Sequence, residues 1–340
     1  MRSVAVHVPE RRQTAQEIED EITARNPRLR LMRGTLRQMY GFEERRVAPD
    51  GTLPSELAVA AAAQVLDQAG LAADAVDLLL FASTGEDLEE PATAHVVAHA
   101  LGVTAPVFDV KNACNGVLNA LETADALIRT GRYRRVLITT GERGSMISTL
   151  PVRDRSELAM FLPALTLSDL GAAVLLEASD RPGLIGGRFY ANSSGWRAMT
   201  LTKPHFTPHT GEVTVRFDFG SLAESFIGMA PAALDVLHDL GVKPDDLALV
   251  AMHQASVPFT RTILGALGIP EHKIVPTFSS YGNAATVSLP LQLVLAEQEG
   301  RLHPGDLVAL LGLASGASAG VMLMEWHPCP TTGSRTAPTR

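Results

Sequence analysis

Leu66-Asp-Gln-Ala-Gly-Leu-Ala-Ala-Asp-Ala-Val-Asp-Leu-Leu-Leu-Phe-Ala82 and Leu237-His-Asp-Leu-Gly-Val-Lys-Pro-Asp-Asp-Leu-Ala-Leu-Val-Ala-Met-His253 are two copies of one pattern. Each copy reads as the end of a helix, a glycine that stops it, an acidic turn and a buried strand. The second copy follows the first by 171 residues (237 − 66). An internal repeat decides the whole architecture, so we expect two halves with the same α/β topology.

The repeat continues beyond these segments. In the first half Cys114 lies 17 residues before Gly131 (131 − 114), and in the second half Asn283 lies 17 residues before Gly300 (300 − 283). Each residue opens a helical pattern that ends near the glycine and leads into an apolar strand. If a pseudo-twofold axis relates the halves, Cys114 and Asn283 approach a common centre, where we expect the chemistry.

Strand-like and helix-like segments alternate along most of the chain, which is typical of βαβ units. The expected strands are Val76–Ala82, Val107–Val110, Val136–Thr140, Leu247–Met252, Leu307–Leu311 and Gly320–Trp326. The expected helices are Ser55–Ala69, Ala92–Leu101, Gly116–Arg129, Leu222–Leu240, Pro258–Leu267 and Ala284–Glu299. We therefore expect one half at residues 1–178, a second half at 179–328, and a disordered Pro/Thr/Ser-rich tail at 329–340.

The composition is that of a compact folded protein. Of 340 residues, 46% are hydrophobic and 19% are charged, and the mean hydropathy is +0.12. A net charge of -8 gives no reason to expect nucleic acid as a partner. No apolar run is long enough to cross a bilayer, and the first residues lack a secretory signal. Two cysteines, Cys114 and Cys329, cannot make a disulfide framework, so a cytoplasmic location is expected.

Cys114 lies where an apolar strand ends and a helix starts, in Phe108-Asp-Val-Lys-Asn-Ala-Cys-Asn-Gly116. Unpaired N–H groups and the positive end of the helix dipole favour a thiolate, so we expect the pKa of this thiol to fall below its ordinary value. The alternative is a buried cysteine that acts only as a small hydrophobic residue.

Three further elements of the second half are candidates for the same site. His253 ends the run Leu247–Met252 and should stand at the carboxyl edge of a strand, although a purely structural histidine fits the same position. Asn283 fits a helix N-cap as well as a substrate contact. The small-residue segment Leu311–Gly320 either lets backbone N–H groups approach a reacting oxygen or is a plain tight turn.

Four segments together resemble the active-site motifs of ketoacyl-ACP synthase III. They are Asp109-Val-Lys-Asn-Ala-Cys-Asn-Gly116, His253-Gln-Ala-Ser256, Gly282-Asn-Ala-Ala-Thr-Val-Ser-Leu-Pro290 and Ala314-Ser-Gly316. Further similarity at 41–46, 87–91 and 170–176 extends the resemblance over about residues 1–326. It implies a thiolase-like α/β fold, with two duplicated βαβαβ halves in a five-layered α-β-α-β-α arrangement.

The resemblance implies a ping-pong acyl transfer. Cys114 would take an acyl group from a CoA or carrier-protein thioester, with the N–H groups of Cys114 and Gly316 as oxyanion hole and Ser315 beside them as a substrate contact. His253 and Asn283 would hold a malonyl-type thioester during decarboxylation, and the resulting carbon nucleophile would attack the acyl-cysteine. No metal or redox cofactor is expected, because CoA or phosphopantetheine enters only as the thioester substrate.

The sequence departs from the family where CoA binds. The family's adenine-stacking tryptophan is absent from Arg33-Gly-Thr-Leu-Arg-Gln-Met-Tyr40, and Arg155 is the candidate for its matching arginine. Seven arginines between Arg25 and Arg46, including Arg37, make a basic stretch on an acidic protein. That stretch favours an acidic carrier protein or its phosphopantetheine phosphate, and the alternative is a solvated helix face.

A second departure is Glu90, directly before Pro91. In the family this residue is typically apolar, comes from the neighbouring subunit of a homodimer and closes the acyl pocket. A carboxylate at this position predicts an unusual acyl group and a specialised enzyme of secondary metabolism.

Three other functions fit parts of the pattern. Relatives on this scaffold also pass the acyl group to a hydroxyl or amine, which makes ester or amide formation the main alternative. A non-catalytic partner that only binds acyl carriers is a second alternative. The order Cys, His, Asn is also that of papain-like proteases, but the local segments of that family are absent.

Overall fold

The structure is a computed structural model, and it describes residues 1–181, 183–202 and 213–327. Its strands are β1 Ser3–His7, β2 Arg12–Thr14, β3 Glu44–Arg46, β4 Leu78–Phe81, β5 Val107–Asp109, β6 Arg135–Arg143, β7 Asp169–Glu177, β8 Leu184–Ala191, β9 Met199–Leu201, β10 Val215–Phe217, β11 Leu249–Met252, β12 Leu307–Ala314 and β13 Ser318–Glu325. Its α-helices are α1 Ala15–Arg25, α2 Thr35–Tyr40, α3 Pro54–Ala69, α4 Thr93–Leu101, α5 Gly116–Arg129, α6 Arg155–Phe161, α7 Phe219–Asp239, α8 Val257–Leu267, α9 Phe278–Tyr281 and α10 Ser288–Gln298. Cys329 and the tail 329–340 lie outside the described residues.

Two sheets share one pattern of strand pairing. In the first sheet, ordered β1-β7-β6-β4-β5, β4 is parallel to β6, β6 antiparallel to β7, and β7 antiparallel to β1. The second sheet, ordered β11-β12-β13-β8, repeats these relations strand for strand, with β11 in the place of β4. Only β5 has no counterpart in the second sheet. The strand pairing therefore shows the internal duplication that the sequence repeat indicated.

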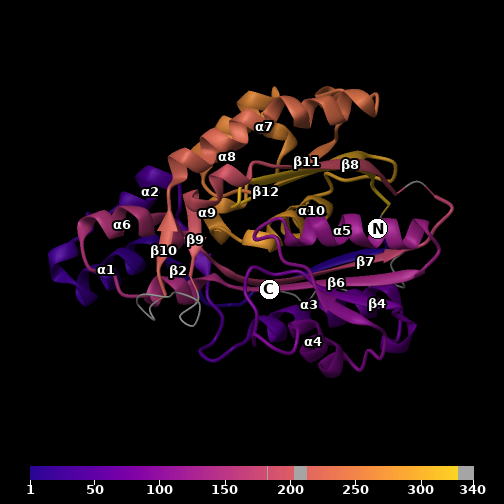
Figure 1. Cartoon of the computed structure of the whole chain (residues 1–340), viewed down its shortest axis with the longest axis horizontal. Helices are drawn as coiled ribbons and strands as arrows, with labels where there is room; N and C mark the ends of the chain where they lie inside the picture. The colour runs from indigo at the N-terminus through magenta and orange to yellow at the C-terminus, as the bar shows by residue number, and fades with distance from the viewer. Residues whose placement is uncertain (182, 203–212, 328–340) are drawn as a thin grey trace.

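The elements stack in five layers (Figure 1). Helices α3 and α4 cover the outer face of the first sheet, α5 and α10 lie between the sheets, and α7 and α8 cover the outer face of the second. The alternation of side chains along β4 explains this packing. Leu78 and Leu80 belong to the core between the sheets, whereas Leu79 and Phe81 pack under α3 and α4.

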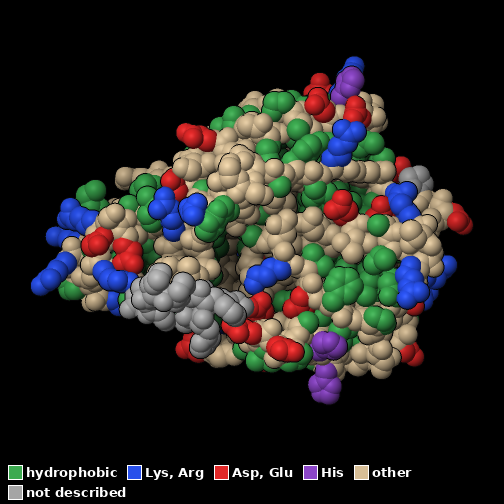
Figure 2. All heavy atoms as spheres, viewed as in Figure 1, with side chains coloured by type: hydrophobic (Ala, Val, Ile, Leu, Met, Phe, Trp, Pro, Cys, Tyr) green, Lys and Arg blue, Asp and Glu red, His purple; other side chains and the backbone are tan. Residues whose placement is uncertain are grey.

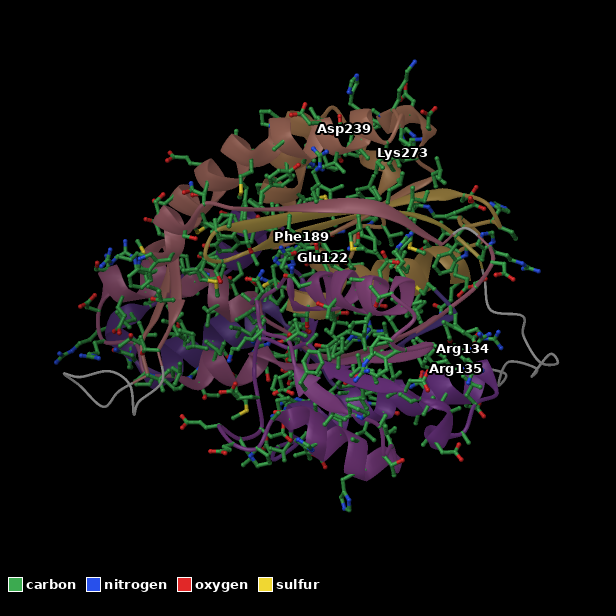
Figure 3. All side chains as sticks on the ribbon, turned by 45° about the vertical axis from the view of Figure 1, so that its right-hand side comes forward. Glu122, Arg134, Arg135, Phe189, Asp239 and Lys273 are labelled. Atoms are coloured by element: carbon green, nitrogen blue, oxygen red, sulfur yellow. The ribbon has the colours of Figure 1, made fainter. Side chains whose placement is uncertain are left out.

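The central layer is closed on both sides by apolar side chains. Phe189 of β8 packs against the core that contains Leu118 and Leu121 of α5. Figure 3 labels Phe189 on β8 and Glu122 on α5, where the second sheet passes over this helix. Helix α5, which begins two residues after Cys114, is thus fixed against both sheets.

A separate apolar cluster lies at one end of the molecule, where α1, α2 and α6 meet. The short strands β2 and β3 pair there, and Phe278 of α9 joins the cluster from the second half. Among the described residues, no helix is long and apolar enough to cross a membrane.

The structure differs from the expected elements mainly at their ends. The helix expected at Ala284–Glu299 begins at Ser288, because residues Ala285–Val287 form a 3₁₀ turn. Strand β6 extends beyond the expected Thr140 to Arg143. This extension carries Glu142 to the carboxyl end of the strand.

Candidate active site

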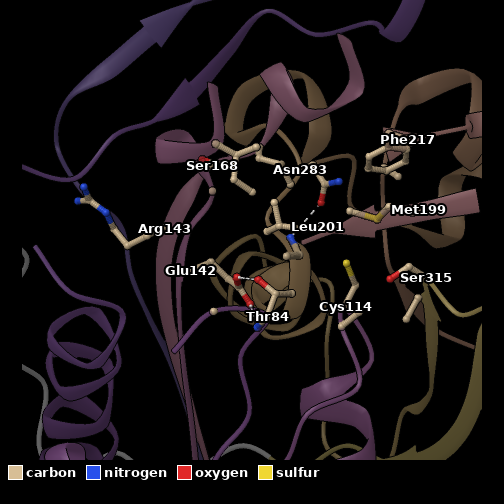
Figure 4. A pocket seen from close by; sticks show the side chains of 18 of the residues that line it. Thr84, Cys114, Glu142, Arg143, Ser168, Met199, Leu201, Phe217, Asn283 and Ser315 are labelled. Carbon is tan, nitrogen blue, oxygen red and sulfur yellow. Dashed lines mark hydrogen bonds between the residues drawn. The ribbon is translucent and has the colours of Figure 1, made fainter. Parts of the chain in front are cut away.

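One cavity of about 730 Å³ brings the three candidate residues together. Cys114 reaches it from the start of α5, His253 from the end of β11, and Asn283 from the segment before α10. Figure 4 shows the sulfur of Cys114 pointing into the space that Asn283 also faces. The two halves of the chain therefore meet at this site, as the repeat predicted.

Cys114 lies two residues before Gly116, the first residue of α5. Its thiol is not the activated thiolate that we expected from the helix start. Burial, and after it the charge of the nearby Glu142 carboxyl, raise the pKa of Cys114 to about 12. The expectation was wrong because loss of water around the sulfur outweighs the favourable backbone amides. At neutral pH this residue is a neutral thiol.

His253 directly follows β11 and is buried, with 4% of its surface exposed. Its Nδ1 lies 3.1 Å from Ser288 Oγ, at the first residue of α10. Burial lowers the pKa of this imidazole to about 4, against a smaller opposing effect of the Ala285 backbone. The ring is therefore neutral at pH 7.

Asn283 is held by the first half of the chain. Its N–H donates to Thr166 O at 2.8 Å, and its carbonyl accepts from Ser168 N at 3.1 Å. Its side-chain oxygen accepts from Ala285 N at 3.0 Å. Since α10 begins only at Ser288, Asn283 does not cap that helix. Its side-chain amide nitrogen has no partner among the described residues and is available to a ligand.

Glu142 is a cavity residue that we did not predict. It is 2% exposed and sits at the end of β6, where its carboxyl oxygens accept from Thr84 N at 3.0 Å, from the Thr84 hydroxyl and from the Thr286 hydroxyl. Burial raises the pKa of this carboxyl, against the effect of the hydrogen bonds from Thr286 and Thr84. The only sequence signal was a carboxylate two residues after the expected strand Val136–Thr140.

An aromatic wall, formed by Phe217, Phe219, Phe226 and Phe259, lines one side of the cavity and was also missed. The rings of Phe219 and Phe259 meet edge to face at 5.3 Å, and those of Phe226 and Phe259 at 5.7 Å. Four of the eleven phenylalanines of the chain lie here. Phe217, Phe219 and Phe226 come from β10 and α7, which lie far from the motifs in sequence. Phe259 comes from α8, which begins directly after the His253–Ser256 motif.

The expected binding residues fall into two groups. Ser315 lines the cavity, in the turn between β12 and β13 that also holds Gly316. Arg37, Arg155 and Glu90 are exposed and do not line the cavity of their own chain. Arg37 pairs with Glu43, and Arg155 opens α6.

The basic stretch is smaller at the surface than its sequence indicated. Arg25, Arg28, Arg30, Arg33 and Arg37 are exposed, and Figure 2 shows Lys and Arg side chains at this end of the molecule. Arg45, however, is buried, with 2% of its surface exposed. Within the described ranges no group of acidic, histidine and cysteine side chains has the arrangement of a metal site.

A duplicated five-layer fold with a cysteine, a histidine and an asparagine on one internal cavity defines a thiolase-fold condensing enzyme. Solved structures agree: OleA of Xanthomonas campestris with bound cerulenin superimposes with a TM-score of 0.87 at 26% identity, over 96% of each chain. An OleA variant with bound lauric acid and lauroyl-CoA gives the same TM-score and identity, over 96% of this chain and 98% of that one. The expected fold class is thus confirmed.

The family follows from the sequence comparisons. Models of the 3-oxoacyl-[acyl-carrier-protein] synthase III family match residues 108–193 and, for its C-terminal part, residues 237–326. The beta-ketoacyl-[acyl-carrier-protein] synthase III of Bordetella petrii is 31% identical, over 93% of this chain and 94% of that protein. That of Listeria innocua is 30% identical, over 86% and 89%. The chain belongs to the ketoacyl-ACP synthase III family and is an acyl-transferring condensing enzyme.

Proposed function

We propose that this enzyme forms an acyl-Cys114 intermediate from an acyl-CoA or acyl-carrier thioester, and then joins the acyl group to a malonyl-type carbon nucleophile. The observation that carries the proposal is the convergence of Cys114, His253 and Asn283 on one cavity from three separate segments. Family membership supports condensation of acyl thioesters, and the malonyl donor is our addition.

In the first half-reaction the sulfur of Cys114 attacks the thioester carbonyl. A sulfur–carbon bond forms, the thioester bond breaks, and the thiol proton passes to the leaving sulfur, which departs as a free thiol. Because the resting thiol is neutral, this proton must move during the attack. Backbone N–H groups of Cys114 and Gly316 are the proposed oxyanion hole, next to Ser315 on the cavity wall.

In the second half-reaction His253 and Asn283 stabilise an enolate. We assign the Ser288 hydroxyl as the donor to Nδ1, so that the neutral imidazole carries its proton on Nε2 and donates it to the thioester oxygen of the malonyl-type donor. The free amide nitrogen of Asn283 supplies a second donor. The malonyl group loses carbon dioxide, the enolate carbon bonds to the acyl carbonyl carbon, and Cys114 leaves as a thiolate that takes up a proton.

The aromatic wall supports an apolar acyl chain as the group carried by Cys114. Met199, Leu201 and Leu222 extend the apolar surface formed by Phe217 and Phe226. Figure 4 shows Met199 and Phe217 on the side of the cavity toward which the sulfur points. The structurally similar OleA holds lauroyl-CoA, which supports a chain longer than acetyl.

The exposed arginines of α1, α2 and the segment between them support a carrier protein as the donor of the acyl group. They form a basic surface on a protein of net charge -8, and Arg37 and Arg155 belong to the same end of the molecule. A phosphopantetheine phosphate or acidic carrier side chains would find complementary charge there. Binding of a carrier protein through this basic surface should weaken as the salt concentration rises, whereas binding through contacts within the cavity should not.

Glu90 is proposed to act in the cavity of a partner subunit, since it is exposed and does not line the cavity of its own chain. In OleA, variants of one glutamate have been solved, and this residue precedes the cysteine of the solved cysteine variants by 26 positions (143 − 117). Glu90 precedes Cys114 by 24 (114 − 90). The proposed homodimer is supported by the edge position of β5, where Phe108 is 40% exposed.

The test is intact-mass spectrometry of the protein after incubation with acyl-CoA and acyl-carrier thioesters. We expect a mass gain of one acyl group on the native protein and none on Cys114→Ala. Added malonyl carrier should then discharge the acyl group and release carbon dioxide. Discharge by an alcohol or amine without carbon dioxide would replace carbon condensation by ester or amide formation, and absence of any Cys114-dependent acylation would leave only a binding role.

A further inference from the structure

Arg45 of β3 is a buried cation that takes no part in the chemistry described above. Its five N–H bonds go to four acceptors: Nε and Nη2 donate to Gln13 Oε1 at 2.9 and 2.6 Å, Nη2 to Ser148 Oγ at 2.8 Å, and Nη1 to Leu165 O and Leu167 O at 3.2 and 2.9 Å. Within the described part of the chain it forms no salt bridge. Burial lowers its pKa to about 10, with the charge of Asp169 opposing, so the guanidinium is charged at neutral pH.

A buried charge whose hydrogen bonds all go to neutral acceptors holds those acceptors tightly, because losing any of them leaves an unpaired donor in the interior. Two of the acceptors are the carbonyls of Leu165 and Leu167. The carbonyl between them, that of Thr166, accepts the N–H of Asn283 at 2.8 Å. Arg45 thus fixes the peptides on both sides of the group that holds Asn283.

The segment before Asn283 is packed directly against Arg45. A Cβ placed on Gly282 would lie 2.4 Å from Thr166 O and 3.2 Å from the Cβ of Arg45. The next residue of β3 adds a further tie: the N–H of Arg46 donates to Ser168 Oγ at 2.9 Å, and Ser168 N donates to the carbonyl of Asn283.

We propose that Arg45 is a positioning residue that sets the side chain of Asn283 for the second half-reaction, by clamping residues 165–167 against the Asn283 backbone. This inference rests on the proposed function, because it assigns Arg45 to the step that Asn283 serves. Cys114 lies at the start of α5 and has no hydrogen bond to Arg45 or to residues 165–167, which we call the clamp. Arg45 should therefore matter little for acylation.

The test measures the two half-reactions separately in Arg45→Lys, which keeps the charge and loses the fork of donors. We expect the rate of acyl transfer onto Cys114, monitored by intact-mass spectrometry, to stay within about twofold of the native rate. Discharge by a malonyl carrier should slow by roughly 10- to 100-fold, the size expected when a catalytic group is misplaced by about 1 Å. Introduced into Asn283→Ala, the same change should add no further loss.

Two further variants separate positioning from general loss of structure. Glu19 is also a buried charge of the same end of the molecule, but its oxygens accept from Gly34 N and Leu36 N and not from the clamp. Glu19→Gln should lower Tm without changing the ratio of the half-reactions. Ser148→Ala removes one acceptor of the same guanidinium and should slow discharge by a smaller factor, also where Arg45→Lys does not fold.

The rates of the two half-reactions distinguish failure of the role proposed for Arg45 from failure of the proposed function. Equal slowing of both half-reactions by Arg45→Lys, an unchanged discharge rate, or a full additional loss in the Asn283→Ala background would each overturn this inference and leave the proposed function standing. If Asn283→Ala itself leaves discharge unchanged, the proposed function fails first and the role of Arg45 fails with it.

Discussion

The two copies of the repeat use the same structural position in different ways. In the first half, Cys114 lies two residues before α5 and its sulfur faces the cavity. In the second half, Asn283 lies five residues before α10, and the first residue of that helix, Ser288, bonds to His253 instead. A 3₁₀ turn fills the space between Asn283 and the helix.

This difference shows that the first half of the chain holds a reactive group of the second half. Asn283 belongs to the second half, yet its backbone is bonded to Thr166 and Ser168 of the first half. Thr286, three residues after Asn283, donates to Glu142 near the end of β6 in the first sheet. The first half thus supplies the nucleophile and also the support for the carboxamide. The site exists only where the halves meet.

The largest effect is expected when the side chains that the second half contributes to the site, Asn283 and His253, are removed. Asn283→Ala or His253→Ala should lower the rate of discharge by malonyl carrier by roughly 100- to 1,000-fold, the usual cost of deleting a donor to a developing oxyanion. Acylation of Cys114 should change only a few-fold. Single-turnover kinetics of each half-reaction would measure these rates. An equal loss of rate in both half-reactions would show that Asn283 and His253 do not act specifically in the second one.

A smaller effect is expected when the contact between the halves is disturbed at Gly282. Its φ of 70° and the carbonyl of Thr166 leave no room for a Cβ. Gly282→Ala should therefore cost roughly 1–3 kcal/mol of unfolding free energy, and slow discharge more than acylation. Denaturant unfolding with half-reaction rates provides the measurement, and Gly228→Ala, where a Cβ meets nothing within 4 Å, is the matched control. A stable variant with native rates would argue against tight contact here.

The aromatic wall predicts a change of substrate range. Leu222→Trp should fill the apolar side of the cavity and shift the preferred acyl chain to fewer carbons, by about tenfold in relative kcat/KM, the scale of discrimination per methylene group in an apolar pocket. Acylation rates across a series from acetyl to palmitoyl thioesters would show it. Unaltered chain-length preference would place the acyl chain elsewhere.

The smallest effect concerns the resting thiol. Below a pKa of about 12, the thiolate fraction of Cys114 rises tenfold per pH unit, so alkylation by iodoacetamide should keep accelerating from pH 7 to 9 without a plateau. Glu142→Gln removes a group that raises this pKa, and should speed alkylation a few-fold at pH 9. A plateau below pH 8 would mean that the helix start activates the thiol after all.

Much of the fold could be predicted because local patterns and the repeat agree. The strand and helix at 76–82 and 116–129 follow from apolar runs and glycine stops, and the observed α5 has the expected bounds. The candidate site residues Cys114, His253 and Asn283 were predicted from their places at the ends of strands or starts of helices and from the family resemblance, and all three line one cavity. The predicted pKa of Cys114 failed because burial depends on the whole cavity and not on the helix start.

The aromatic wall and the burial of Arg45 could not be predicted from the sequence. The aromatic wall joins Phe217 and Phe259, which lie 42 residues apart (259 − 217) and share no local pattern. Arg45 looked like one of several surface arginines, and only the packing of β3 against residues 165–168 shows that it is buried. Such residues act through tertiary contacts that no sequence period reports.

The central claim, that the second half's groups stabilise the enolate independently of the nucleophile, is tested most directly by carbon dioxide release from a malonyl carrier thioester. We expect Cys114→Ala to decarboxylate the malonyl donor still, although it forms no acyl-enzyme, and the double variant Cys114→Ala, Asn283→Ala not to do so. Decarboxylation that disappears with Cys114 alone, or that persists in the double variant, would contradict it.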